Sequence, residues 1–139
     1  MVLLDTDHMS ILERGGSSAR LLTLKLSELP ESQIATTIVS YEEQCKGWLA
    51  KTSNARGEAL IRAYSYLGQH LEVYGAIRVQ PFDVGAHAVF LDLQVQRIRI
   101  GTQDLKIAAI ALANDATVLT RNTQHFARVP NLKFEDWSV

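Results

Sequence analysis

The chain has 139 residues, 47% of them hydrophobic, and a formal net charge of −1. This length suits one domain that buries roughly two-thirds of its unfolded surface, and the near-neutral charge argues against a broadly basic nucleic-acid-binding surface. A single cysteine, Cys45, excludes an internal disulfide and favours a reducing compartment. No segment approaches a membrane span, so we expect a cytoplasmic protein without membrane contacts.

The first strand is expected at Val2–Leu4, a continuous apolar run typical of a strand buried on both faces. Asp5 follows it directly, and a second carboxylate stands at Asp7. A carboxylate at the C-terminal end of a central parallel strand lies where α/β folds bind their ligands. Two acids beside a core are costly to desolvate unless a cation or hydrogen bonds compensate. The alternative is structural: Asp7 or Ser10 caps the next helix and Asp5 orders the turn.

Helices and strands then alternate along the chain. We expect helices at 7–13 and from Ser17 or Ser18 to 27, a strand at 33–36, and helices at 39–51 and 54–72 that form a helical hairpin. The second half of the chain continues the alternation. We expect a strand at 77–79, a helix from the Asp83 cap to about 97–99, a helix from the Thr102 cap to 113, a strand at 117–120, a helical turn at 123–126 and an edge strand at 132–134.

This alternation predicts the α/β class. Strands separated by helices form a doubly wound, mainly parallel sheet, so we expect a three-layer α/β/α sandwich in a single domain over 1–139, with the hairpin added. The helix after Thr102 is apolar nearly all round and should be buried on most sides. Two other helices carry apolar stripes that we expect to face the core, namely Leu60, Tyr64, Leu67 and Leu71, and Val84, Ala88, Leu91 and Val95.

Three acids stand out by position. Asp5 closes the first strand, Glu43 lies early in the helix after the second strand, and Asp104 lies in the first turn of the buried helix. In a doubly wound sheet these places meet at one edge, so the three side chains can converge. Glu42 points about 100° away from Glu43 around the helix, and we expect only Glu43 to reach the site. For Asp104 the alternative is a favourable interaction with the helix dipole alone, worth about 0.3–1 kcal/mol.

Three converging carboxylates repel one another unless a divalent ion joins them. Oxygen ligands alone select hard cations, so Mg²⁺ or Mn²⁺ is the expected metal. The four histidines lack the spacing of a soft-metal site; most are expected at the surface, with His8 alone near the acids. Arg99, Lys106, Arg121 and Arg128 cluster around the same segments, where they could hold phosphates or be ordinary solvated charges.

With these residues in place the chain resembles the PIN-domain family and, within it, the VapC-type toxins of toxin–antitoxin pairs. The resemblance implies a metal-dependent endoribonuclease that cleaves RNA phosphodiester bonds. It makes Asp5, Glu43 and Asp104 the catalytic acids and the ligands of Mg²⁺ or Mn²⁺. The matching stretches are Leu3–Asp7, Ser40–Gly47, Ile100–Ala109, Leu119–Asn122, His125–Pro130 and Glu135–Trp137.

The resemblance also implies a homodimer and a cognate VapB-like antitoxin whose C-terminal segment occupies the cleft, with the hairpin over 39–72 as its expected docking surface. Many family members carry a fourth acid after the fourth strand. Here that position is Asn122, which offers a carbonyl oxygen without charge and leaves one or two metal ions possible. Around the acids we expect support from Thr6, Asp7, Ser40 and Asn122, and a phosphate contact from Arg121.

Two other functions fit parts of the sequence. Leu3–Asp7 also matches the start of haloacid-dehalogenase-type phosphatases, in which the first Asp is a nucleophile. That fold needs a later lysine and paired acids, whereas this chain has Arg121 and Asn122 after the fourth strand. A non-catalytic PIN module that binds nucleic acid or a partner protein is the second alternative, and the intact set of three acids argues against it.

Overall fold

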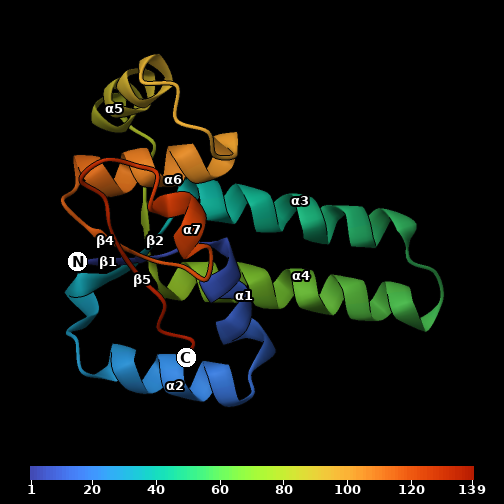
Figure 1. Ribbon diagram of the computed structural model, residues 1–139. Coiled ribbons are helices and arrows are strands. Elements are labelled where there is room, and N and C mark those ends of the chain that lie inside the picture. Colours follow the sequence, from blue (N-terminus) through green and yellow to red (C-terminus); the bar gives the residue numbers. More distant parts are fainter.

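Five short parallel strands form the centre of the molecule in this computed structural model, which describes residues 1–139 (Figure 1). Their order across the sheet is β3-β2-β1-β4-β5, so the chain winds outward from β1 in both directions. Every neighbouring pair is parallel, which confirms the predicted sheet and places β5 at the expected edge. The strands are β1 (Val2–Leu4), β2 (Ile34–Thr37), β3 (Arg78–Gln80), β4 (Thr117–Leu119) and β5 (Lys133–Glu135).

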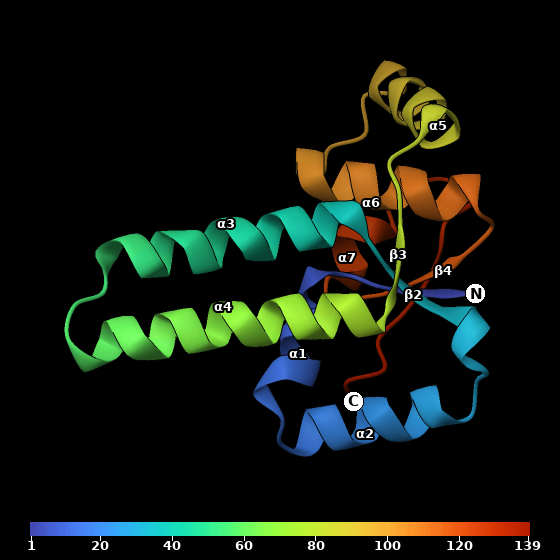
Figure 2. The same ribbon diagram turned by 180° about the vertical axis from the view of Figure 1, so that it is seen from behind.

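Helices cover both faces of this sheet, which confirms the predicted three layers. Figures 1 and 2 show α1 and α2 on one side, α5 and α6 on the other, and α3 and α4 extending together beyond the sheet. A membrane-crossing helix, which needs a long apolar run, is not found among them. The helices are α1 (Thr6–Arg14), α2 (Ser17–Ser27), α3 (Ile38–Asn54), α4 (Glu58–Ala76), α5 (Val84–Val95), α6 (Thr102–Ala113) and α7 (Thr123–Phe126), with a 3₁₀ turn at Glu31–Gln33.

The central strand contributes side chains to two separate cores. Leu3 packs with residues of α5 and α6, whereas Val2 and Leu4 pack with residues of α1 and α2. Because successive strand residues point to opposite faces, both layers bury apolar side chains against the same three residues. This is why all three residues of β1 are apolar. The first polar residue, Asp5, comes where the strand ends, at the carboxyl end of the sheet.

The hairpin is present, but its turn lies further along the chain than predicted. Asn54 is the last residue of α3 and does not open the next helix, which runs to Ala76 and so extends beyond residue 72. Within the last turns of α3, the hydroxyls of Thr52 and Ser53 both donate back to the Leu49 carbonyl. The chain reverses at Gly57, whose φ of 60° favours glycine.

The predicted core stripe of α5 is wrong. Val84 is 87% and Val95 79% exposed, while Ala86, Phe90 and Leu93 are buried. Apolar residues occupy both sides of this helix, so its pattern does not reveal which side packs on α6.

The stripe predicted for the second hairpin helix is also wrong in part. Tyr64 and Leu71 are exposed, and Ala63, His70 and Tyr74 are buried in their place. The ring of His70 stacks on Tyr41 with centroids 5.3 Å apart, so an aromatic contact compensates for burying an imidazole. The expectation of surface histidines therefore fails at His70, and it fails again at His8, which is fully buried.

The two sides of the α5–α6 layer predict different responses to truncation. Ile107 on α6 is fully buried, so Ile107→Ala should lower the free energy of unfolding by about 2–5 kcal/mol through lost contacts and a residual cavity. Val95→Ala on the exposed side of α5 should change it by no more than about 0.5 kcal/mol. Urea unfolding of both variants measures the difference, and equal losses would contradict this assignment of the two faces.

Candidate active site

Asp5 ends the central strand and begins the first helix. Its Oδ1 accepts the backbone N–H of His8 at 2.9 Å, and its own N–H donates to the Leu119 carbonyl at 3.0 Å. Asp5 itself is therefore the N-cap of α1, in place of Asp7 or Ser10. Capping occupies one oxygen of a carboxylate that is only 4% exposed.

Glu43 lies in the second turn of α3 and faces the start of α1. Its Oε1 accepts the Thr6 hydroxyl at 2.6 Å. Burial raises the pKa of the Glu43 carboxyl, and the charges of Asp104, Asp5 and Asp7 raise it further. Glu43 therefore lies within electrostatic reach of the other predicted acids.

Glu42 points elsewhere. Its carboxylate accepts the Gln103 side-chain amide at 2.8 Å and lies 3.3 Å from the Lys46 ammonium. The Gln103 hydrogen bond, supported by Lys46, lowers the pKa of Glu42, opposite to the shift of Glu43. The two neighbouring glutamates are thus separated by the rotation of the helix.

Asp104 lies in the first turn of α6. Burial raises the pKa of its carboxyl, and the charge of Asp5 adds to the rise. Its Oδ2 accepts the Asn122 side-chain N–H at 3.1 Å, and the same amide nitrogen is 2.7 Å from His125 Nδ1. We call Asp5, Glu43 and Asp104 the acidic group. Its members come from the end of β1 and from the first two turns of α3 and α6.

The other predicted site residues divide into two sets. Thr6 and Asn122 contact the acidic group directly, and exposed Asp7 lies near enough to raise the pKa of both Glu43 and Asp104. Ser40 is buried at the N-terminus of α3, where its hydroxyl lies 3.1 Å from that of Thr37. Arg121 donates to the hydroxyls of Ser138 and Ser18, at 2.8 and 3.1 Å, and so turns toward other segments.

Sequence reasoning placed His8 alone near the acids and missed His125. His125 follows Asn122 by three residues, and its charge lowers the pKa of Asp104, against the larger effect of burial. His8 lies with Nδ1 3.5 Å from Asp5 Oδ1. The i, i+3 spacing of Asn122 and His125 around a predicted helical turn was a usable signal for His125.

The donor chemistry of the acidic group fits a hard divalent cation. No three Asp, Glu, His or Cys side chains surround one common metal position. Burial raises the pKa of Glu43 and of Asp104, and the neighbouring carboxylates add to both rises, so a nearby positive charge would favour their ionised forms. No lysine or arginine is paired with any of the three, and a bound cation would supply positive charge there.

Comparisons with known proteins agree on one family. No family model matches the chain. It is 27% identical over 137 residues to ribonuclease VapC1 of Haemophilus influenzae, covering 98% of this chain and 97% of that protein. It is 36% identical over 66 residues to ribonuclease VapC2 of Rickettsia felis, a match that spans 49% of that protein.

Solved structures extend the likeness to the whole fold. VapBC2 from Rickettsia felis bound to a DNA fragment from their promoter aligns with a TM-score of 0.71 at 25% identity, over 99% of both chains. In sequence and in fold the chain is therefore similar to VapC-type proteins. VapBC-1 from nontypeable Haemophilus influenzae shares the fold at a TM-score of 0.71 and 24% identity, over the full length of both chains.

The burial of Glu43, together with the charges of its acidic neighbours, predicts a pH-dependent stability of the metal-free protein. A raised folded-state pKa means that ionised Glu43 opposes folding, so stability falls as pH rises through that pKa. Glu43→Gln should therefore melt at the same or a higher temperature than wild type at about pH 7, and lose the gain at about pH 4, where Glu43 is protonated.

Thermal melts in a chelating buffer measure this, with Glu42→Gln as the matched control. Hydrogen bonds hold the pKa of Glu42 low, so its removal should give no gain at neutral pH. A stabilisation by Glu42→Gln that equals that of Glu43→Gln would contradict the assignment.

Proposed function

We propose that this VapC-type chain is a metal-dependent endoribonuclease, the toxin of a toxin–antitoxin pair. The observation that carries the proposal is the acidic group, held at the carboxyl edge of a parallel sheet without a lysine or arginine partner. The ribonuclease names of the VapC1 and VapC2 relatives support the same reaction.

Within this proposal Asp5 and Asp104 hold Mg²⁺, or Mn²⁺ in its place, and Glu43 completes the site directly or through water. When bound, such an ion lowers the pKa of a water, polarises a phosphoryl oxygen and orients in-line attack on the phosphodiester. Glu43 can assist by taking a proton, because its raised pKa makes it a better proton acceptor near neutral pH than an exposed glutamate.

Two neighbouring side chains support these acids. The Thr6 hydroxyl holds one oxygen of Glu43, and the Asn122 amide holds one oxygen of Asp104. Because Asn122 points its N–H donor at Asp104 and His125, it acts here as an orienting group without charge. Three carboxylates then carry the chemistry, and a second metal ion would lack the fourth acid of other family members.

Arg121 and Ser40 would take part less directly. A phosphate contact by Arg121 would require its guanidinium to leave Ser138 and Ser18. Ser40 would act through the N-terminus of α3, which positions Glu43. An RNA-cleaving toxin of this kind is expected in the cytoplasm, where its substrate is.

A groove between α1 and the hairpin is the proposed docking site of the antitoxin segment. The hollow measures about 1000 Å³ and combines an aromatic pair with charges of both signs. Trp48 stacks on Tyr66 with centroids 5.4 Å apart, and Lys51 lies over the Trp48 ring. Glu13 and Arg62 add a negative and a positive charge to its lining. Such a surface suits an amphipathic peptide segment.

The homodimer stays a prediction from the family. Exposed apolar residues on α5, Val84 at 87% and Val95 at 79%, with Leu91 at 48%, are the kind of surface that a second copy covers in oligomers.

A metal titration with and without RNA tests the catalytic proposal. We expect cleavage of RNA that requires Mg²⁺ or Mn²⁺ and stops in excess chelator. Asp104→Asn should reduce cleavage by about a hundredfold or more, because it removes a ligand charge. Glu42→Gln should stay near wild type. RNA binding without cleavage in the wild type would instead support the non-catalytic module.

Antitoxin docking can be tested without touching the acidic group. Ala59 lies on the groove wall and is exposed. Ala59→Arg should weaken binding of the cognate antitoxin, to be sought in a small reading frame immediately upstream, by about tenfold or more, because a long charged side chain fills the groove. RNA cleavage by the isolated variant should be unchanged. Ala113→Arg, at the exposed end of α6, is the control, and calorimetric titration that finds equal binding by both variants would refute the groove assignment.

A further inference from the structure

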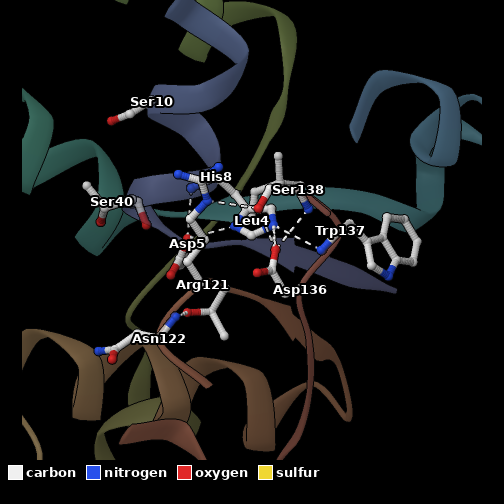
Figure 3. A network of polar contacts seen from close by, with 12 residues as sticks. Leu4, Asp5, His8, Ser10, Ser40, Arg121, Asn122, Asp136, Trp137 and Ser138 are labelled. Carbon is white, nitrogen blue, oxygen red and sulfur yellow. Dashed lines mark hydrogen bonds and ion pairs between the residues drawn. The ribbon is translucent and has the colours of Figure 1, made fainter. Parts of the chain in front are cut away.

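His8 lies between the catalytic carboxylate Asp5 and a segment more than a hundred residues away. The imidazole is fully buried on α1. Figure 3 shows Asp5 on one side of it and the segment Asp136–Ser138, which follows β5, on the other. Nδ1 lies 3.5 Å from Asp5 Oδ1, and Nε2 lies 3.3 Å from the backbone nitrogen of Trp137. One ring therefore joins the site to the distant segment.

The Trp137 contact decides the proton's position on this ring. A backbone N–H cannot give up its proton, so Nε2 must present a lone pair to it and accept. Asp136 Oδ1 is also 3.6 Å from Nε2, but this oxygen already accepts the N–H and the hydroxyl of Ser138, at 2.9 and 2.6 Å. Nε2 is thus the acceptor of the ring, and a neutral imidazole then carries its proton on Nδ1.

Nδ1 is buried and has no hydrogen-bond partner at ordinary distance. Its nearest charged neighbour is Asp5 Oδ1, 3.5 Å away, which also accepts the His8 backbone N–H. A buried donor without a partner is costly, and a small approach of the two groups would satisfy it. Two N–H groups of one residue, one from the backbone and one from the ring, therefore face the same carboxylate oxygen.

We propose that His8 is a positioning residue for Asp5, held in its Nδ1–H tautomer by the Trp137 backbone. The two His8 donors hold Oδ1 and leave the second oxygen of Asp5 for the cation. This inference rests on the proposed metal-dependent function. Residues that do not bind a metal themselves commonly orient its ligands through hydrogen bonds. Loss of such a hydrogen bond costs about 10- to 100-fold in metal affinity or activity.

The distant segment is itself anchored, so it can act as a fixed support. Residues of β5 pair with β4, and the chain continues from there across the start of α1. Arg121 then ties it down by donating to Ser138 and to Ser18 of α2. The role of Arg121 in this structure is therefore to hold the Asp136–Ser138 segment against His8.

Ring-nitrogen NMR of the metal-free protein tests the tautomer directly. Long-range proton–nitrogen correlation of the full chain should show His8 protonated on Nδ1 and bare on Nε2, with the His8 signals assigned by their loss in His8→Asn. Both Trp137→Pro and Trp137→Ala remove the indole. Only Trp137→Pro also removes the backbone N–H that donates to Nε2. We expect Trp137→Ala to retain the Nδ1–H pattern and Trp137→Pro to shift protons to Nε2. A wild-type ring protonated on Nε2 would overturn the inference.

Mn²⁺ titration calorimetry tests the positioning role. His8→Asn keeps an N–H donor near the position of Nδ1 and should bind Mn²⁺ about as tightly as wild type. His8→Leu keeps an apolar, buried side chain without a donor and should bind about tenfold more weakly. Melting curves without metal check that both variants fold. If His8→Leu does not fold, the Trp137 pair carries the same test, with Trp137→Pro weaker than Trp137→Ala. Equal Mn²⁺ affinity within either pair overturns the inference.

Failure of this inference is distinguishable from failure of the proposed function. Wild-type protein that binds no Mn²⁺ would contradict the metal-dependent function and, with it, the positioning role. Wild-type protein that binds Mn²⁺ and cleaves RNA, but whose affinity is unaffected by His8→Leu, would overturn the inference alone.

Discussion

Repulsion among three partly buried carboxylates is the interaction on which the rest of this structure depends. In a parallel sheet the strands all end at the same edge, and helices begin there. Asp5 at the end of β1, Glu43 near the start of α3 and Asp104 near the start of α6 therefore reach one edge of the sheet. Burial raises the pKa of Glu43 and of Asp104, and each is raised further by its neighbours. The protein pairs no lysine or arginine with them, and this is why a divalent cation is proposed as their partner.

The carboxylates are oriented without being neutralised. Each has one oxygen held by an uncharged donor from another place in the chain: a backbone N–H of α1 for Asp5, the Thr6 hydroxyl for Glu43 and the Asn122 amide for Asp104. An arginine or lysine in these places would fix the geometry equally well but would compete with the cation for the same charge. Neutral donors restrict the side chains and leave their full negative charge available.

The same fold leaves apolar surface in two places away from this edge. The outer side of α5 exposes Val84 and Val95, and the hairpin exposes Ile61 and Leu71. A chain that buries its core through β1 and α6 does not need these residues for folding, so they are available for partner proteins. The exposed side of α5 lies on a helix that holds no member of the acidic group, whereas the hairpin helix α3 also carries Glu43.

The sequence by itself determined the parallel sheet and the buried α6, and it singled out Asp5, Glu43 and Asp104, whose catalytic role stays a prediction. These follow from local signals: apolar runs of strand length, helix spacing and acids at the ends of elements. Only the tertiary structure decided which side of α5 packs, since Val84 and Phe90 look equally apolar along the chain. It also decided that His8 and His70 are buried and that Arg121 turns to Ser138. These outcomes depend on contacts between residues remote in sequence, whose energies appear in no local pattern.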